Sequence, residues 1–204
     1  MPCSSRGFLP RGNPSWLARV CYIWLKECGP NLAGTTIPMA TGSLTSIQEY
    51  LTTVFRPDCD YVDGIIEERN LGEWDHAKLQ GAVSAYLYAR RKQWGIHVGV
   101  ELRVQVSATR FRVPDICVIA GQEPAEQILR TPPFICIEIL SPEDRMARVR
   151  ERVNDYIAFG VPYIWILNPK SREALRCTRE GMLEVTELRT ADPEIVVPLD
   201  ALFE

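Results

Sequence analysis

Two acidic residues interrupt stretches of the sequence that otherwise have the composition of buried β-strands. Asp115 lies in the run Arg112–Ile119, and Glu138 follows 23 residues later in the run Phe134–Leu140. Burying a carboxylate without a partner costs several kcal/mol, and two acids on neighbouring strands repel unless a cation or a proton lies between them. Mg²⁺ commonly meets this need, because it binds one or two carboxylates together with water. The pattern therefore predicts a metal site and favours a metal-dependent hydrolase.

The composition argues against several other classes of protein. The chain is 46% apolar and 24% charged, which is typical of a globular protein. Seven cysteines without a CxxC pair, and only two histidines, give no support for a zinc site. They indicate reduced thiols in a cytoplasmic protein. The net charge of −3 means that contact with nucleic acid would need a local basic patch.

The first 42 residues differ from the rest of the chain. They carry a net charge of +3, which leaves −6 for the remainder. The stretch Trp16–Leu25 is apolar, but Arg19 interrupts it and it is too short to span a bilayer. We expect residues 1–42 to be a leader outside the domain, either disordered or, with Met39 as the true start, largely never made, and residues 43–204 to be a single domain. An amphipathic helix over residues 15–26 is the alternative for the leader.

The hydrophobic pattern of the domain predicts both helices and strands. In order, these are a short helix ending near Phe55, a hairpin at Asp63–Gly64, a helix over 74–93 closed by Gly95, strands over 97–106, 111–120 and 133–140, a helix starting near Ser141 and ending at Gly160, a strand over 161–167, and strands over 173–178 and 182–188. The central order, helix-strand-strand-strand-helix-strand, predicts a mixed α/β (α+β) fold around one sheet.

The side-chain period of the strands predicts which acids share a face. Asp115 falls on the face of Cys117 and Glu138 on the face of Cys136, so each lies among apolar neighbours. Structural ion pairs at the strand ends are the alternative. Glu101 is a further acid, on the preceding predicted strand. A four-residue connection at Ser107–Arg110 turns Glu101 away from Asp115, whereas a bulge or a connection one residue shorter or longer reverses this.

Two predicted helices add further candidates. His76 lies three residues before Leu79 and points to the same inward face, where it either reaches the site or packs on the sheet. Gln80 lies one turn later and could add a polar contact. Arg145 and Arg148 are among the arginines after Glu138. They either contact phosphate or form a solvated face that pairs with nearby acids.

Four short motifs occur in order on these elements. They are Pro114–Asp115, Glu138–Pro142, Arg152 with Tyr156, and Gly160–Trp165. Together they resemble the Uma family of putative restriction endonucleases, which belongs to the PD-(D/E)xK nuclease superfamily. The resemblance covers roughly residues 43–190. It implies a restriction-endonuclease-like mixed sheet flanked by helices, with Mg²⁺ or Mn²⁺ held by Asp115 and Glu138 and with DNA as the substrate.

The chain departs from the family pattern at the lysine. The superfamily has a lysine two residues after the glutamate, where this chain has Leu140. The family instead has one on the next helix, four residues before the tyrosine, where this chain has Arg152. Arginine stays protonated, so Arg152 fits a group that stabilises phosphate charge better than a group that gives a proton to water.

These observations predict a metal-dependent endonuclease that cleaves phosphodiester bonds, with no membrane association. Asp115 and Glu138 are the expected metal ligands. Because the family often has an acidic residue on the strand that carries Glu101, the resemblance adds Glu101 as a third ligand or a group that positions water. Arg152 and His76 are further catalytic residues, and Arg145 and Arg148 are the expected nucleic-acid contacts. Two alternatives remain open. One is a nuclease-fold domain that binds nucleic acid or a protein partner without cutting, and the other is a structural subunit of a homodimer.

Overall fold

The computed structural model describes residues 44–70 and 73–203. All of its elements lie in the unit Gly42–Glu204, and the predicted leader over residues 1–42 lies outside the described residues. None of the helices in these ranges combines the length and the apolar composition that crossing a bilayer requires.

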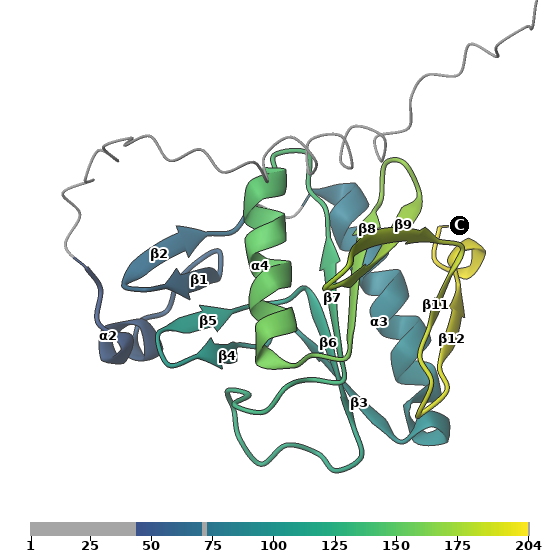
Figure 1. Cartoon of the computed structure of the whole chain (residues 1–204), viewed down its shortest axis with the longest axis horizontal. Coiled ribbons are helices and arrows are strands. Elements are labelled where there is room, and N and C mark those ends of the chain that lie inside the picture. The colour runs from purple at the N-terminus through teal and green to yellow at the C-terminus, as the bar shows by residue number, and fades with distance from the viewer. Residues whose placement is uncertain (1–43, 71–72, 204) are drawn as a thin grey trace, which may run out of the picture. The chain divides into compact units, whose positions relative to one another are not determined.

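The described residues form both helices and strands, as the sequence pattern predicts, but five strands rather than three lie between the two long helices (Figure 1). In chain order they are α2 (Ile47–Thr52), β1 (Cys59–Val62), β2 (Ile65–Glu68), α3 (Trp74–Trp94), β3 (Ile96–Val100), β4 (Val104–Ser107), β5 (Arg110–Arg112), β6 (Ile116–Ala120), β7 (Ile135–Ile139), α4 (Met146–Phe159), β8 (Tyr163–Asn168), β9 (Glu173–Thr178), β10 (Gly181–Val185), β11 (Glu187–Arg189), β12 (Val196–Pro198) and the 3₁₀ turn Leu199–Ala201. Turn chemistry explains several boundaries. Asp63 and Gly64 have φ angles of 50° and 95° between β1 and β2, and Gly95 ends α3 at a φ of 61°.

The strands form two main sheets. A six-stranded sheet has the order β10-β9-β8-β7-β6-β3, in which β7 and β8 are parallel and the other neighbours are antiparallel. A four-stranded sheet has the order β2-β1-β5-β4. The predicted fold class, a mixed sheet flanked by helices, is confirmed. The prediction of one sheet is wrong, because β1, β2, β4 and β5 form a sheet of their own.

The helices α3 and α4 pack on opposite faces of β7. Leu79, Val83 and Leu87 of α3 belong to the main hydrophobic core, together with alternate residues of β7 such as Ile137. The intervening residue Glu138 points to the other face, where Tyr156 of α4 binds it. Figure 1 shows α4 in front of the sheet and α3 behind it. Because both faces of β7 are covered, all five of its residues are buried.

The two predicted strands over 97–106 and 111–120 each break in the middle. The first predicted strand divides into β3 and β4, and the second divides into β5 and β6. β3 pairs with β6 in the six-stranded sheet, and β4 pairs with β5 in the four-stranded sheet. Two residues account for the break. Glu101 has a φ of 51°, outside the β-region, and Pro114 has no amide hydrogen to give to a strand ladder. The chain therefore changes sheets beside Glu101 and Asp115.

A β-bulge near the hairpin turn sets the register at this break. The pairing shifts by one residue between Gln105 and Ser107, opposite β5. Val100 consequently pairs with Ile116, and the next position places Glu101 opposite Asp115. The backbone N–H of Glu101 donates to the carbonyl of Asp115 at 3.2 Å. The sequence left open whether a regular turn directs Glu101 away from Asp115 or a bulge brings the two together. The structure has the bulge.

Candidate active site

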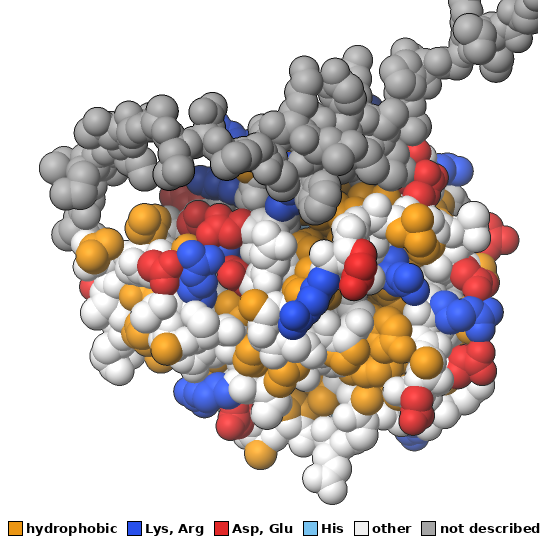
Figure 2. Space-filling view, viewed as in Figure 1, with side chains coloured by type: hydrophobic (Ala, Val, Ile, Leu, Met, Phe, Trp, Pro, Cys, Tyr) orange, Lys and Arg blue, Asp and Glu red, His pale blue; other side chains and the backbone are white. Residues whose placement is uncertain are grey.

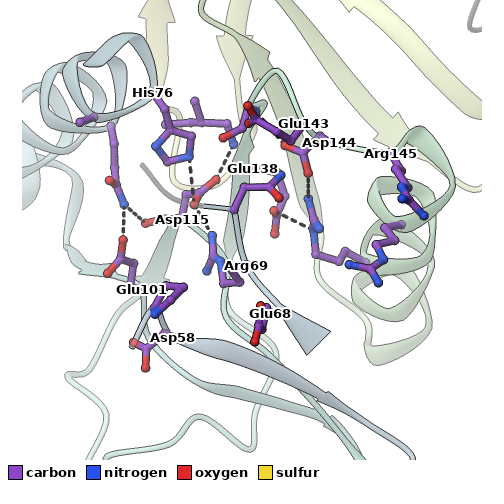
Figure 3. A pocket seen from close by; sticks show the side chains of 18 residues that line it. Asp58, Glu68, Arg69, His76, Glu101, Asp115, Glu138, Glu143, Asp144 and Arg145 are labelled. Carbon is purple, nitrogen blue, oxygen red and sulfur yellow. Dashed lines mark hydrogen bonds and ion pairs between the residues drawn. The ribbon is translucent and has the colours of Figure 1, made fainter. Parts of the chain in front are cut away.

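A cavity of about 350 Å³ lies where the two sheets, the start of α3 and the start of α4 meet (Figure 3). Its lining contains seven Asp or Glu residues, four arginines and His76. The cavity is therefore negative overall, with a formal charge of −3 when the histidine is neutral. A phosphate group would enter this cavity only with help from additional positive charge.

Asp115 and Glu138 form the floor of the cavity. Ile116 of β6 pairs with Ile137 of β7, and the next residue on each chain is one of the two acids. Asp115 and Glu138 both line the cavity, where Figure 3 shows their side chains next to each other. Both residues are 1% exposed. The strand pairing thus brings together the two acids that the sequence singled out.

Each oxygen of Asp115 has partners. The backbone N–H of Ile139 donates to Oδ2 at 2.6 Å, which ties the carboxylate to β7. Oδ1 is bonded by Nη2 of Arg69 and lies 3.4 Å from Nε2 of His76. Burial alone would raise the pKa of Asp115. The charge of Arg69 and the hydrogen bond from His76 outweigh burial and hold this pKa below its ordinary value.

Glu138 has a different set of partners and the opposite pKa shift. The hydroxyl of Tyr156 donates to Oε1 at 2.6 Å, and Nε of Arg152 lies 3.0 Å from Oε2. Burial raises the pKa of Glu138, and the negative charge of Asp115 adds to the effect, while Arg152 opposes it. Neighbouring carboxyl groups whose environments shift their pKa values in opposite directions are typical of sites that handle protons or charge.

Arg152 bridges the floor and the wall of the cavity. Besides Glu138, it contacts Asp144, whose Oδ1 lies 3.3 Å from Nη2. Asp144 is itself held by the backbone N–H of Ser141, which donates to Oδ2 at 2.7 Å. Burial disfavours the charge of Arg152, but Glu138 more than compensates and raises the pKa of the guanidinium above its ordinary value. Arg152 therefore remains a fixed positive charge.

Glu101 and Gln80 occupy the side of the cavity nearest α3. Nε2 of Gln80 lies 3.1 Å from the backbone carbonyl oxygen of Asp115 and 3.4 Å from Oε1 of Glu101. Gln80 thus connects the carboxylate of Glu101 to the chain at Asp115. Glu101 itself is exposed and lines the cavity. The polar contact that the sequence suggested for Gln80 is present in the structure.

The remaining candidates also line the cavity. His76 contacts Asp115, and this hydrogen bond raises the pKa of the imidazole although burial opposes the change. Arg145 is the residue at the N-cap of α4, and Arg148 lies one turn further on. Both are exposed at the cavity wall.

Sequence reasoning missed Arg69. This residue follows β2, and its guanidinium donates to the carbonyl of Val113 as well as to Asp115. No local motif marks it, because its partners lie more than forty residues away in the chain. The one available signal was the requirement of a buried carboxylate for a nearby positive charge.

Two of the predicted metal ligands, Asp115 and Glu138, form ion pairs with arginines in this structure. Arg69 pairs with Asp115 and Arg152 pairs with Glu138. Across residues 44–70 and 73–203, no group of three or more His, Cys, Asp or Glu side chains has an arrangement suited to a metal ion. The metal site inferred from the sequence therefore stays a prediction.

Comparisons with known proteins identify the family. A crystal structure of a putative nuclease belonging to DUF820, from Anabaena variabilis ATCC 29413, superposes with a TM-score of 0.65 at 20% identity, covering 76% of this chain and 96% of that one. This likeness shows a shared fold. No curated protein matches the chain. The model of the Uma2 family, described as "Putative restriction endonuclease", matches residues 47–203. The resemblance read from the motifs is thereby confirmed, and the chain belongs to the Uma2 family of putative restriction endonucleases.

Proposed function

We propose that this protein is an endonuclease that hydrolyses phosphodiester bonds of DNA and requires Mg²⁺ or Mn²⁺. The observation that carries the proposal is that Asp115 and Glu138, both buried, line the floor of one cavity in a chain of a restriction endonuclease family. Two buried acids so close together are stable only with positive charge beside them. Membership of the family supports nuclease chemistry, and the substrate and the metal are our inference.

The donor set fits a hard divalent cation. Asp115 and Glu138 offer carboxylate oxygens from the same face of the sheet, which are the ligands that Mg²⁺ and Mn²⁺ prefer. These two residues would hold the ion, and Glu101 is the third candidate. A bound ion at this place would polarise the scissile phosphate and lower the pKa of a water molecule. Positive charge there would also offset the repulsion from Asp115 that raises the pKa of Glu138.

Arg152 has the properties of a group that stabilises negative charge. Its guanidinium is held between Glu138 and Asp144 at the cavity wall and stays protonated. A donor fixed before the reaction costs no reorganisation when charge develops on the phosphate. Because Arg152 does not release its proton, another group must accept the proton of the attacking water.

Glu101 is the group that we assign to the attacking water. Its carboxylate is exposed to the cavity, and Gln80 holds it by a contact of 3.4 Å. An exposed carboxylate accepts hydrogen bonds from water and can take a proton as the nucleophile forms. The backbone bond between Glu101 and Asp115 keeps this carboxylate beside the floor of the cavity.

Contacts to DNA phosphates are assigned to Arg145 and Arg148. Both line the cavity from α4 and are exposed. The face of the molecule in Figure 2 carries acidic and basic side chains side by side rather than a continuous basic stripe. Because the chain has a net charge of −3 and the cavity lining is itself negative, affinity for DNA depends on these few arginines and on the bound cation.

Cleavage of a supercoiled plasmid tests the proposal. Purified protein should nick the plasmid with Mg²⁺ or Mn²⁺ and lose this activity in EDTA, and Asp115→Asn and Glu138→Gln should abolish it. Glu184→Gln is the matched control, because Glu184 is an exposed carboxylate on β10. Circular dichroism checks that each variant is folded. Nicking that persists in both site variants would show that the activity does not come from this cavity.

A second candidate function is a nuclease-fold domain that binds DNA without cutting it. The pairing of each floor carboxylate with its own arginine favours it, as does the absence of the family lysine at Leu140 and Arg152. Gel-shift measurements on the same preparations separate the two functions. Binding of DNA without nicking under any divalent metal would support the non-cutting protein.

A further inference from the structure

We propose that Arg69 is an internal cation that occupies the metal position in the metal-free protein, so that a divalent ion binds only by displacing it from Asp115. The inference rests on the metal dependence proposed above. It assigns to Arg69 control over metal affinity, a role separate from catalysis.

The bonding of Asp115 carries the first step. Oδ2 accepts the backbone N–H of Ile139 at 2.6 Å, so this oxygen is committed to the strand. Oδ1 is the oxygen that remains for a metal ion, and Arg69 and His76 both point at it. A carboxylate oxygen has two lone pairs. A cation that takes one of these positions must therefore move a present partner, and the positively charged guanidinium is the one that the ion repels.

Arg69 lies against the floor carboxylate oxygen that a metal ion would need. Its guanidinium bonds Oδ1 of Asp115 and lines the same cavity as Glu138. Arg152, in contrast, is placed between Glu138 and Asp144. Arg69 is thus the arginine in the place beside Asp115 that a bound metal ion would take. Figure 3 shows its guanidinium beside Asp115 at the floor of the cavity.

Arg69 is also placed so that it can leave. Its side chain is 19% exposed and lines the cavity, and besides Asp115 the guanidinium donates only to the carbonyl of Val113 among the contacts described. Arg112 gives a useful contrast, because its side chain is 1% exposed and forms ion pairs with several carboxylates. A displaced Arg69 can turn into the cavity, whereas Arg112 has no such space.

The test measures Mn²⁺ alone, without DNA. Binding is followed by electron paramagnetic resonance and calorimetry for the full chain, for Arg69→Gln and for Arg148→Gln. The second variant removes one positive charge from the same cavity without removing a bond to Asp115 or Glu138. Arg69→Gln should bind Mn²⁺ about tenfold more tightly than the natural sequence, because the competing cation is gone. Arg148→Gln should change the affinity less than about threefold.

Thermal unfolding gives an independent readout. Arg69→Gln should have a lower Tm than the natural sequence in EDTA, because Asp115 is left buried without its charged partner. Mn²⁺ should raise the Tm of this variant more than that of the natural sequence. If Arg69→Gln loses so much stability that it folds only with metal bound, addition of EDTA should unfold it, and this outcome also supports the inference. Arg69→Lys keeps the positive charge but cannot contact Asp115 and the carbonyl of Val113 at the same time. Its Mn²⁺ affinity should lie between those of the natural sequence and Arg69→Gln.

Other outcomes would overturn the inference in distinguishable ways. Equal Mn²⁺ affinity of the natural sequence and Arg69→Gln, with binding lost in Asp115→Asn, would reject the role of Arg69 and leave the proposed function intact. Equal tightening in Arg69→Gln and Arg148→Gln would reduce the effect to general electrostatics and also reject it. Absence of Mn²⁺ binding in every variant would overturn the proposed metal dependence, and this inference with it.

Discussion

Tyr156 donates its hydroxyl hydrogen to Oε1 of Glu138 across 2.6 Å, and both side chains are buried. Because this hydrogen bond is made to a carboxylate in the interior, Tyr156→Phe should lower the free energy of unfolding by about 1–3 kcal/mol. It should also reduce cleavage, since Glu138 loses a group that fixes its orientation. Urea denaturation and plasmid nicking measure the two effects. Tyr88→Phe is the control, because Tyr88 is exposed on α3, and an equal loss there would contradict the argument.

Gln80 and Glu101 should behave as one unit in a double-mutant cycle. Glu101→Gln should lower kcat by about a hundredfold if its carboxylate takes the proton of the attacking water. Gln80→Met should lower kcat less, because the carboxylate remains but loses its 3.4 Å contact. The double variant should be no slower than Glu101→Gln alone. Losses that multiply would show that Gln80 does not act through Glu101.

Arg148 should contribute to DNA affinity through phosphate contact. Arg148→Gln should weaken DNA binding at low salt and reduce the slope of log K against log salt by about one. Fluorescence anisotropy at a series of salt concentrations, with Ca²⁺ in place of Mg²⁺, measures this slope. Arg189→Gln removes an exposed arginine on β11 and should leave it unchanged. An unchanged slope in Arg148→Gln would place this arginine outside the DNA contact.

Arg112 should be among the most sensitive positions for stability. Its guanidinium is 1% exposed and forms ion pairs with Asp60, Glu67 and Asp155 at 2.7–3.0 Å. Arg112→Met leaves these acids without their shared cation, which should cost about 3–5 kcal/mol.

Arg110→Met provides the matched comparison. Arg110 also pairs with Asp155 but is 26% exposed, so its loss should cost about 1 kcal/mol or less. Chemical denaturation of both variants gives the ordering, and similar losses would contradict the importance of burial.

Asp63 should make a measurable contribution to acid sensitivity. The hydroxyl of Thr109 donates to its carboxylate at 2.6 Å, and together with Arg110 lowers the pKa of Asp63 below its ordinary value. A carboxyl with a lowered pKa stabilises the fold above its unfolded pKa, and this stabilisation is lost as the pH falls through the folded pKa. Asp63→Asn should therefore cost about 0.5–1 kcal/mol at pH 7, because the side chain is half exposed, and close to nothing near pH 2. Asparagine also accepts the positive φ of this turn. If Asp63→Asn changes the free energy of unfolding equally at pH 7 and near pH 2, the lowered pKa of Asp63 does not contribute to acid sensitivity.

The sequence predicts the parts of this fold that depend on local chemistry. The Asp63–Gly64 turn and the long helix ended by Gly95 follow from spacing and turn residues, and the structure agrees. The break of two long strands into two sheets was only partly visible in the sequence. Pro114 is a signal against a continuous central strand, because proline has no amide hydrogen to give to the ladder. Glu101 is ordinary in a strand pattern, and its positive φ arises from the tertiary arrangement.

The candidate site shows the same division. Asp115 and Glu138 were found because an acid within an apolar strand is unusual, and strand pairing brings them together. Arg69 was not found, because a long-range ion pair leaves no periodic trace in the chain. The identity of the counter-charge for a buried acid is decided by packing between distant segments, whereas the need for one is visible in the sequence.

The bulge between Gln105 and Ser107 has a consequence far from where it occurs. If Val106 paired regularly with Phe111, every residue of β3 and β4 would slide by one position against the opposite strand. Glu101 would then lie across from Ile116 and exchange faces. Sequence changes in the turn at 107–110 can therefore switch a carboxylate into or out of the cavity without altering any residue that lines it. Variation among relatives in the length of this turn is a place to look for gain and loss of activity.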